Sequence, residues 1–343
     1  MEGLSYRPRV TFPGTTLHTP LTPPSAGVVV LHGSGGARNP WSAHRAAQLA
    51  HQGFVAAAFA WFGCDGLSPR IQRIPLDRTE AFLRWFRAGP AAGLPVVLFG
   101  ASRGAEHALL LASLLADTEL FEGVAAHAGI DRAVRGYDPA TRGPVMTEQG
   151  EDAAWTWRGE PLYGRGSGPP GVDPRIPIED YPGRLWLSHG DADETWSVEG
   201  TRRLAAARGE LPTVTRIWPG EGHGLRSPDA VASQRRSLAF FIATTPSADP
   251  ADFVGAWSGR WGGVRPSCLV VDGLDGEKAT VRYEIDGQGT GPRTARLSRD
   301  GTLAFGSLTF RLSPDGATLH GLHERHPGRI GGVVAMHRGP LPK

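Results

Sequence analysis

Short apolar runs alternate with amphipathic stretches along the first 245 residues of the chain. Six runs have the length and the continuous apolar character of buried parallel strands, over residues 26–32, 54–60, 94–100, 122–129, 184–190 and 213–220. The stretches between them carry apolar residues at helical spacing, over residues 41–52, 76–88, 103–116, 197–207 and 228–243. This alternation predicts an α/β domain at residues 1–245, with a mostly parallel sheet covered by helices on both faces.

Two parts of the chain do not follow this alternation. Residues 131–182 are rich in Gly, Pro and Arg and include Trp155 and Trp157. A long irregular insertion is either functional or disordered, and its aromatic residues favour a lid or pocket wall. Residues 246–252 are predicted to be a polar linker. Residues 253–343 are short alternating segments separated by Asp-Gly turns, which predicts an all-β accessory domain, a small antiparallel barrel or sandwich.

The segment from Gly100 to Gly104 has the pattern G-x-S-x-G and lies between a predicted strand and a predicted helix. In such an elbow the strand turns into the helix so sharply that the serine takes a strained backbone, which only small neighbours permit. The serine also lies at a helix N-terminus, where the helix dipole favours negative charge. The pattern alone is weak, but its position between strand and helix predicts that Ser102 is a nucleophile.

A serine nucleophile needs a base, and the base needs a third group that orients it. In this fold the acid and then the histidine follow the serine along the chain. His223, in a Gly-flanked loop after the last predicted strand, is the candidate base. The G-x-x-D spacing from Gly190 favours Asp193 as the acid. Asp65, after the second predicted strand, is a weaker candidate. The neighbours that compete with Asp193 are Asp191 and Glu194.

A tetrahedral intermediate needs two backbone N–H donors. Arg103, which follows the nucleophile, is expected to supply one, and the Gly-rich loop after the first strand the other, from Ser34 or Gly35. His127 is a candidate for either the pocket or a structural role. Glu106 and His107 are expected to pack the helix or to lie on the surface. The predicted pocket residues are His32, Trp61, Trp155, Trp157 and Trp196.

Composition narrows the possible functions. The formal net charge is only +2, which gives no nucleic-acid footprint. Cys64 and Cys268 are far apart, and no Cys/His spacing of a metal site is present. The start of the chain lacks the apolar stretch of a secretory signal, and no apolar run has membrane-spanning length. We therefore expect a cytoplasmic protein without metal or cofactor that acts on a small molecule. The sequence gives no indication of an oligomeric state.

Several motifs together resemble the catalytic domain of the acyl-CoA thioesterase and bile acid-CoA:amino acid N-acyltransferase family, within the α/β-hydrolases. They are VVVLHGSGG, GASRGAEHALLLAS, AWTWRGEPLYG, HGDADETWS and WPGEGHGL, within residues 26–242. The resemblance implies that Ser102, Asp193 and His223 correspond to the family's triad. Dienelactone-hydrolase-like enzymes are also similar, but they usually carry Cys as the nucleophile. Eukaryotic family members have a β-sandwich before this domain, whereas here a β module follows it.

The sequence thus predicts a serine hydrolase that cleaves carboxylic thioester or ester bonds through an acyl-enzyme. Three alternatives stay open. The first is an acyltransferase, which passes the acyl group to an amine or alcohol. The second is a sugar-ester hydrolase whose C-terminal module binds carbohydrate, with Trp257 and Trp261 as candidates for stacking on the sugar. The third is a protein that binds ligands without catalysis. Arginines of the insertion are candidates for contacts with CoA phosphates, namely Arg132, Arg135, Arg142, Arg158 and Arg165.

Overall fold

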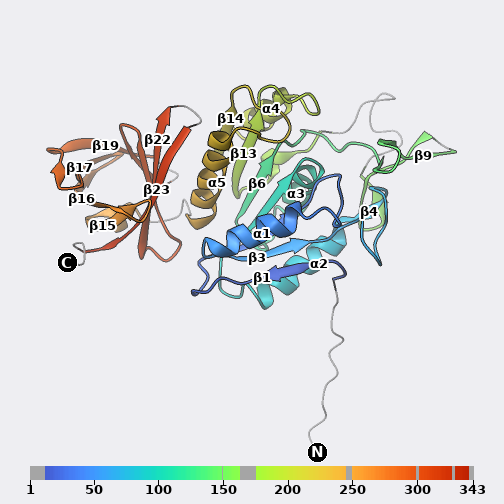
Figure 1. The fold of residues 1–343 in the computed structure, drawn as a ribbon, viewed down its shortest axis with the longest axis horizontal. Helices are drawn as coiled ribbons and strands as arrows, with labels where there is room; N and C mark the ends of the chain where they lie inside the picture. Colours follow the sequence, from blue (N-terminus) through green and yellow to red (C-terminus); the bar gives the residue numbers. More distant parts are fainter. Residues whose placement is uncertain are drawn as a thin grey trace, which may run out of the picture.

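The computed structural model describes residues 12–148, 150–162, 175–244, 249–298, 301–326 and 329–339. A seven-stranded sheet forms the centre of the first domain, in the order β1-β3-β2-β5-β6-β13-β14 (Figure 1). The six predicted strands are present and pair in parallel, as β2 (Gly27–Leu31), β3 (Val55–Phe59), β5 (Val96–Ala101), β6 (Gly123–His127), β13 (Arg184–Gly190) and β14 (Thr213–Trp218). The predicted mostly parallel sheet is confirmed. At one edge β1 (Thr16–His18), which the sequence pattern does not predict, pairs antiparallel with β3.

Helices cover both faces of this sheet, as predicted. One face carries α1 (Trp41–His51) and α5 (Pro228–Ala243). The other face carries α2 (Leu76–Ala88), α3 (Arg103–Leu114) and α4 (Val198–Ala207). The chain runs from β2 outward to β3 and then returns to place β5 on the other side of β2. Loops diverge at such a point, so ligands of α/β sheets bind at the carboxyl ends of these strands.

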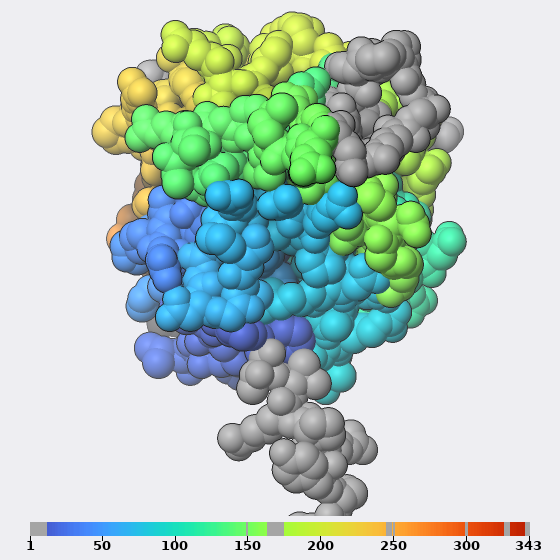
Figure 2. Space-filling model, turned by 90° about the vertical axis from the view of Figure 1, so that its right-hand side faces the viewer, coloured from blue at the N-terminus to red at the C-terminus, as the bar shows by residue number. Residues whose placement is uncertain are grey.

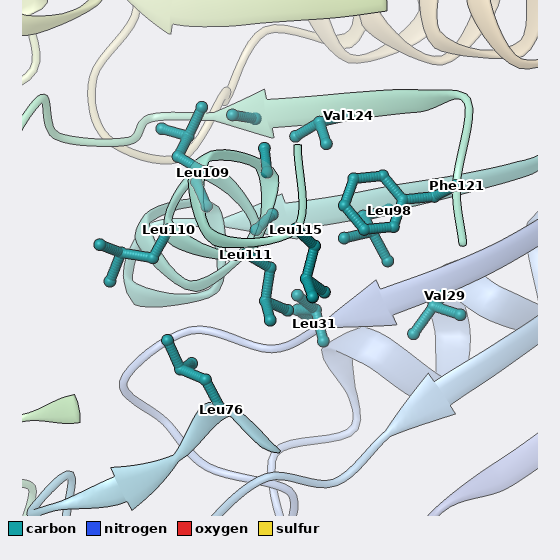
Figure 3. Close-up of a cluster of buried hydrophobic side chains, with 14 of the residues drawn as sticks. Val29, Leu31, Leu76, Leu98, Leu109, Leu110, Leu111, Leu115, Phe121 and Val124 are labelled. Carbon is teal, nitrogen blue, oxygen red and sulfur yellow. The ribbon is translucent and has the colours of Figure 1, made fainter. Parts of the chain in front are cut away.

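The central strands β2, β3 and β5 are hydrophobic because both of their faces are buried. Successive strand residues point to opposite faces, so Val28 and Val30 join the core under α1 and α5, whereas Val29 and Leu31 join the core under α2 and α3. Figure 3 shows the second core, in which sheet residues meet the leucines of α3. This packing fixes α3, and with it the turn that precedes α3, against the sheet.

The described part of the insertion at 131–182 consists of short strands and a 3₁₀ turn. The strands are β7 (Tyr137–Asp138), β8 (Gly143–Pro144), β9 (Met146–Thr147), β10 (Gly150–Glu151), β11 (Trp155–Trp157) and β12 (Glu160–Pro161), followed by the 3₁₀ turn η1 (Ile178–Asp180). β11 pairs in parallel with β4 (Ile74–Pro75) of the first half of the chain. Figure 2 shows the green surface of this region lying against the blue and cyan N-terminal half. Residues 149 and 163–174, with Arg165, lie outside the described residues.

A buried carboxylate ties the insertion to α3. Glu106 is completely buried and accepts hydrogen bonds from the Val134 N–H (2.8 Å) and the Trp155 indole N–H (2.6 Å). Its other oxygen lies 2.8 Å from the guanidinium of Arg103, which is itself only 4% exposed. Glu106 therefore packs inside the protein and not on the surface, and it neutralises a buried cation directly after the elbow.

The C-terminal module is a closed antiparallel barrel. Besides its neighbours in the sheet order, β16 pairs with β17, so eight strands close on themselves and β18 adds outside β17. Trp257 and Trp261 point into the barrel core, where Trp257 donates to the Phe253 carbonyl oxygen and Trp261 to the Tyr283 hydroxyl. Both tryptophans are buried, so neither offers a face for sugar stacking. The elements are η2 (Pro250–Phe253), β15 (Gly255–Trp261), β16 (Arg265–Asp275), β17 (Lys278–Ile285), β18 (Gln288–Gly289), β19 (Arg293–Ser298), β20 (Thr302–Phe305), β21 (Leu308–Leu312), β22 (Thr318–His326) and β23 (Arg329–Arg338).

The barrel packs against the outer side of α5, on the left in Figure 1. The Ile330 N–H donates to the Ser233 hydroxyl (3.2 Å), and Arg236 donates to the Ile330 carbonyl oxygen (2.8 Å). An ion pair between Arg216 of β14 and Glu324 of β22 (3.3 Å) adds a second link. The barrel thus contacts the helix whose inner side packs on the sheet.

The elbow requires glycine on both sides of Ser102. A Cβ on Gly100 would lie less than 3.0 Å from the Gly104 carbonyl group, and a Cβ on Gly104 less than 3.0 Å from the carbonyl oxygens of Leu31 and His32. Real Cβ atoms do not approach backbone so closely. The end of β5 and the start of α3 can therefore pack against the end of β2 only when both positions lack a side chain.

We expect Glu106→Gln to lower the free energy of unfolding by about 3–5 kcal/mol, because it removes the carboxylate that lies 2.8 Å from the buried Arg103 guanidinium. The matched control is Glu199→Gln, which breaks the Arg202–Glu199 pair at the same helical spacing but with both side chains more than half exposed. That loss should stay below about 1 kcal/mol. Calorimetric unfolding of the two variants measures the difference, and equal losses would contradict the buried role of Glu106.

Gly104→Ala should destabilise the first domain by about 3 kcal/mol or more, because the added methyl group meets two rigid carbonyls. Gly224→Ala is its control, since a Cβ there has no neighbour within 4 Å. Urea unfolding of both variants checks this prediction. A Gly104→Ala protein as stable as the control would show that the backbone does not approach this closely.

Candidate active site

Ser102 lies between β5 and α3 with the backbone of a strained turn. Its φ is 55° and its ψ −122°, a region that residues with a side chain rarely occupy. The Ser102 N–H donates to the His127 carbonyl oxygen at the end of the neighbouring β6 (2.9 Å). The serine is thus held at the carboxyl edge of the sheet by β5, which leads into the turn, and by its hydrogen bond to the neighbouring β6.

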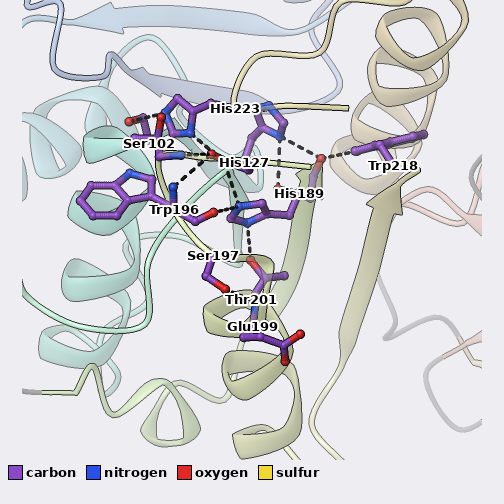
Figure 4. Close-up of polar contacts among 12 residues, drawn as sticks. Ser102, His127, His189, Trp196, Ser197, Glu199, Thr201, Trp218 and His223 are labelled. Carbon is purple, nitrogen blue, oxygen red and sulfur yellow. Dashed lines mark hydrogen bonds and ion pairs between the residues drawn. The ribbon is translucent and has the colours of Figure 1, made fainter. Parts of the chain in front are cut away.

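The structure brings the three predicted residues of the triad together (Figure 4). His223 Nε2 lies 2.9 Å from Ser102 Oγ, and His223 Nδ1 lies 2.8 Å from Asp193 Oδ2. These groups come from three separate loops, after β5, β13 and β14. Since Nδ1 faces a carboxylate, it carries the proton, and Nε2 is left as an acceptor for the serine hydroxyl.

Of the competing acids, Asp193 is the one that reaches His223. Its side chain is fully buried, and Oδ1 accepts from the backbone N–H groups of Thr195 (2.7 Å) and Trp196 (3.0 Å). Burial raises the pKa of the Asp193 carboxyl, but these N–H groups and the His223 ring outweigh it, so that its pKa is lower than usual. The alternatives lie elsewhere: Asp191 accepts from the Gly220 N–H, Glu194 is exposed, and Asp65 pairs with Arg38.

A second histidine, His189, supports the acid and was not predicted from sequence. Its Nε2 lies 2.9 Å from both Asp193 Oδ2 and the Trp196 carbonyl oxygen, and its Nδ1 lies 2.7 Å from the Thr201 hydroxyl. Burial lowers the pKa of His189 more than Asp193 and the carbonyl raise it, so the ring stays neutral. Nε2 therefore carries the proton and donates to the Trp196 carbonyl oxygen beside Asp193, while Nδ1 accepts from Thr201.

The Gly-rich loop after β2 lies directly beside the serine. A Cβ on Gly33 would lie 3.3 Å from Ser102 Cβ, a tight contact that a glycine avoids. His32 is buried, stacks on Trp61 with ring centroids 4.8 Å apart, and accepts the Trp61 backbone N–H at Nε2 (3.3 Å). Burial lowers the pKa of His32 to about 4. The neutral ring donates from Nδ1 to the Gly33 carbonyl oxygen (3.1 Å).

This bond also orients the next peptide group. The C=O and N–H of one trans peptide point in opposite directions. Fixing the Gly33 carbonyl toward His32 therefore turns the Ser34 N–H to the other side. Ser34 and Gly35 both line the cavity in front of Ser102.

A cavity of about 450 Å³ opens in front of Ser102. Its walls come from the Gly-rich loop, the start of α1, the end of β6, the loop at His223 and the inner side of α5. Among the described residues the lining is His32, Gly33, Ser34, Gly35, Gly36, Asn39, Trp41, Arg45, Ala101, Ser102, His127, Ala128, His223, Gly224, Leu225, Val231 and Gln234. The cavity thus lies between α1 and α5.

Four of the five predicted pocket residues do not line this cavity. His32 does, but Trp61, Trp155, Trp157 and Trp196 do not. Trp155 is buried against Glu106, and Trp61 backs His32. Trp157 lies under the Arg158 guanidinium, 4.2 Å from the ring centre, and the Trp196 backbone binds Asp193 and His189. These four tryptophans therefore make contacts outside the cavity, and the prediction that they line the pocket is wrong for this cavity.

His127 has both roles that the sequence left open. It lines the cavity, and its Nδ1 lies 3.0 Å from the Ser188 hydroxyl, which also accepts from the Trp218 indole N–H (2.7 Å) (Figure 4). Burial, with the nearby His189, His223 and Arg45, lowers the pKa of His127 to about 3. The ring is therefore a neutral wall of the cavity.

The cysteines, possible metal ligands and possible membrane helices can be checked in the part of the chain that the structure describes. Neither Cys64 nor Cys268 forms a disulfide. No cluster of three or more His, Cys, Asp or Glu side chains with metal-ligand geometry occurs among the described residues. Within the same residues, none of the helices has the length and hydropathy needed to cross a membrane.

Curated proteins similar to this chain are acyl-coenzyme A thioesterases. Mouse acyl-coenzyme A thioesterase 1 is 27% identical over 234 residues, covering 62% of this chain and 52% of its own length. Mouse mitochondrial acyl-coenzyme A thioesterase 2 is 28% identical over 234 residues, covering 62% of this chain and 48% of its own length. The chain therefore spans about half the length of the curated relatives it matches. No protein-family model matches it.

Among solved structures, the esterase domain of a Rhodothermus marinus protein is similar at 19% identity and a TM-score of 0.44, covering 66% of this chain and 90% of its own. A carboxyl esterase from Bacillus coagulans is similar at 15% identity and a TM-score of 0.47, covering 66% of this chain and 92% of its own. The parallel sheet with helices on both faces is evident from the strand order itself. Over about 62% of its length, the chain is similar to acyl-coenzyme A thioesterases 1 and 2, at 27–28% identity.

Proposed function

We propose that this protein is a serine hydrolase that cleaves carboxylic thioester or ester bonds through an acyl-enzyme on Ser102. The observation that carries the proposal is the continuous hydrogen-bonded series from Ser102 Oγ to His223 (2.9 Å) and from His223 to Asp193 (2.8 Å). The strained serine at the strand-to-helix turn supports it, because strain of this kind is retained where a side chain must be presented to a substrate.

In the proposed reaction, Ser102 Oγ attacks the acyl carbon while its proton passes to His223 Nε2. The tetrahedral intermediate collapses when the bond to the leaving thiol or alcohol breaks, and His223 returns the proton to that group. Water then attacks the acyl-enzyme with His223 as the base again, and the carboxylic acid leaves from Ser102. Asp193 stays ionised throughout and stabilises the charge that develops on His223.

The negative charge of the tetrahedral intermediate falls between α3 and the Gly-rich loop. The backbone N–H of Arg103, at the first turn of α3, is the proposed first donor, and the helix N-terminus favours an anion there. The N–H of Ser34 or Gly35 is the proposed second donor, with the orientation that His32 imposes on the Gly33 carbonyl. Preorganised donors of this kind are each worth about 10²–10³ in rate.

The substrate class rests on the relatives. The curated relatives are named as acyl-coenzyme A thioesterases, which favours an acyl thioester. The cavity of about 450 Å³ has the size of a small-molecule site. Thioesters and esters share one acyl-enzyme chemistry, and the two substrate classes are separated by comparing acyl-CoAs with 4-nitrophenyl esters of the same acyl chains.

We expect a fluorophosphonate probe to label the protein on Ser102, and Ser102→Ala to abolish both labelling and turnover. The loss of kcat should be on the order of 10⁶-fold, down to the background rate. Ser34→Ala serves as control, because it keeps the backbone N–H of the loop and should still be labelled. Failure of the probe to label the unaltered protein would reject the serine-hydrolase function.

Asp193→Asn should lower kcat by about 10³- to 10⁴-fold, because an amide at this position no longer fixes the protonated Nδ1 of His223. Asp191→Asn, two residues earlier in the same loop, should change kcat less than about threefold, since Asp191 contacts the Gly220 N–H and not the histidine. Steady-state kinetics on one acyl series gives both values. Similar losses for the two variants would remove Asp193 from the proposed triad.

A further inference from the structure

The cavity in front of Ser102 contains a cation whose role the proposed reaction does not explain. Arg45, on α1, is the one Arg or Lys among the described lining residues, and none of these residues is Asp or Glu. The cavity wall therefore carries a positive charge without a counter-charge. Its proximity to the reacting groups is clear from His127, whose pKa Arg45 helps to lower.

Arg45 is held in position by neutral groups. Its guanidinium donates to the side-chain oxygens of Gln48 (3.4 Å) and Gln234 (3.3 Å). It also lies 5.7 Å from the ring centre of Trp41 and 5.8 Å from that of Phe99, a cation–π arrangement. None of the ion pairs among the described residues includes Arg45. The guanidinium is thus oriented without being neutralised.

Gln234 of α5 adds an unused donor to the same wall. The side chain is only 2% exposed, and its Nε2 is buried with no hydrogen-bond partner among the described residues. Because its Oε1 accepts from Arg45, the amide nitrogen is the end that faces away from the guanidinium. A buried N–H without a partner is costly, and the residue that carries it lines the cavity. A small movement of this side chain would let a ligand oxygen in the cavity satisfy the N–H.

A purely structural role explains this arrangement poorly. Burial, with repulsion from Arg235, lowers the pKa of Arg45 to about 10, so the side chain stays charged at neutral pH. A half-buried cation without a carboxylate costs stability compared with an apolar side chain of similar size. Arg132 and Arg158, which were candidates for phosphate contacts, instead pair with carboxylates of Asp131 and Asp77. They are neutralised within the protein, whereas Arg45 is not.

We propose that the substrate carries an anionic oxygen group, a carboxylate or a phosphate, a few bonds from the scissile carbonyl, and that Arg45 and Gln234 bind it. A guanidinium matches planar anionic oxygens, and the Gln234 N–H supplies a further donor. Arg45 and Ser102 line one cavity of about 450 Å³, which sets the short separation between the two groups. This proposal rests on the proposed hydrolase function and adds a specificity-determining contact to it.

The test uses two matched pairs of substrates that separate the two possible sources of the anion. For an anion on the acyl group, 4-nitrophenyl hemisuccinate is compared with 4-nitrophenyl butyrate. For an anion on the leaving group, S-butyryl-3-mercaptopropionate is compared with its methyl ester, which keeps the thioester but lacks the carboxylate. kcat/KM is measured in 0.15 M salt, where interactions between exposed charges beyond about 8 Å are screened.

We expect the anionic member of one pair to be favoured by about 10- to 100-fold, the range of a hydrogen bond to a charged group. Arg45→Gln should reduce that preference to about threefold or less, and Arg45→Lys, which keeps the charge, should retain part of it. Arg235→Gln is the matched control, because Arg235 is an exposed neighbour outside the cavity lining and its loss should leave the preference in place. Fluorophosphonate labelling of each variant gives the fraction of active protein.

Three outcomes overturn the proposal. The first is that the unaltered protein hydrolyses both neutral substrates as fast as their anionic partners, or faster. The second is that the preference for the anionic substrate survives in Arg45→Gln. The third is that Arg235→Gln removes this preference as completely as Arg45→Gln does. Each of these leaves the hydrolase function intact. No hydrolysis of any of the four substrates together with no labelling of Ser102 would instead reject the proposed function itself.

Discussion

The position of Ser102 depends on one close approach of backbone to backbone. The end of β5 and the start of α3 lie against the end of β2, at a distance that leaves no room for a Cβ on Gly100 or Gly104. This contact forces the serine into its strained conformation and places its hydroxyl at the carboxyl edge of the sheet. Gly33 extends the same contact to the neighbouring loop, so the proposed oxyanion donors and the serine are set by one packing constraint.

Buried polar groups fix the positions of the surrounding loops relative to this turn. Glu106 joins the first turn of α3 to the insertion through Val134 and Trp155. On the other side, Asp193 receives three hydrogen bonds, two from backbone N–H groups and one from His223, and His189 lies 2.9 Å from the same carboxylate, which leaves it little freedom. In a low-dielectric interior such groups specify one arrangement, because any other leaves a charge or a donor unsatisfied. The positions of the catalytic side chains are therefore fixed by buried contacts outside the cavity rather than by contacts within it.

The sequence predicts the features that depend on local pattern. The strands, the helices and the elbow follow from periodicity and from glycine spacing, and the fold's chain order indicates Asp193 and His223. Features that depend on distant contacts were missed or wrong. An aromatic residue such as Trp155 does not reveal from sequence whether its N–H meets a substrate or a buried carboxylate. Arg45 and Gln234 are 189 positions apart, and only the packing of α1 and α5 on one sheet face brings them together. A signal for His189 is its place in the strand directly before Asp193.

As the proposed nucleophile, Ser102 forms a covalent bond with the acyl group during turnover. Mass spectrometry can detect this acyl-enzyme directly in protein quenched in acid within the first turnovers of a slowly deacylating 4-nitrophenyl ester. We predict a mass increase equal to one acyl group, located on the peptide that contains Ser102, and absent in Ser102→Ala. Turnover without any adduct, or an adduct on a different residue, would contradict it.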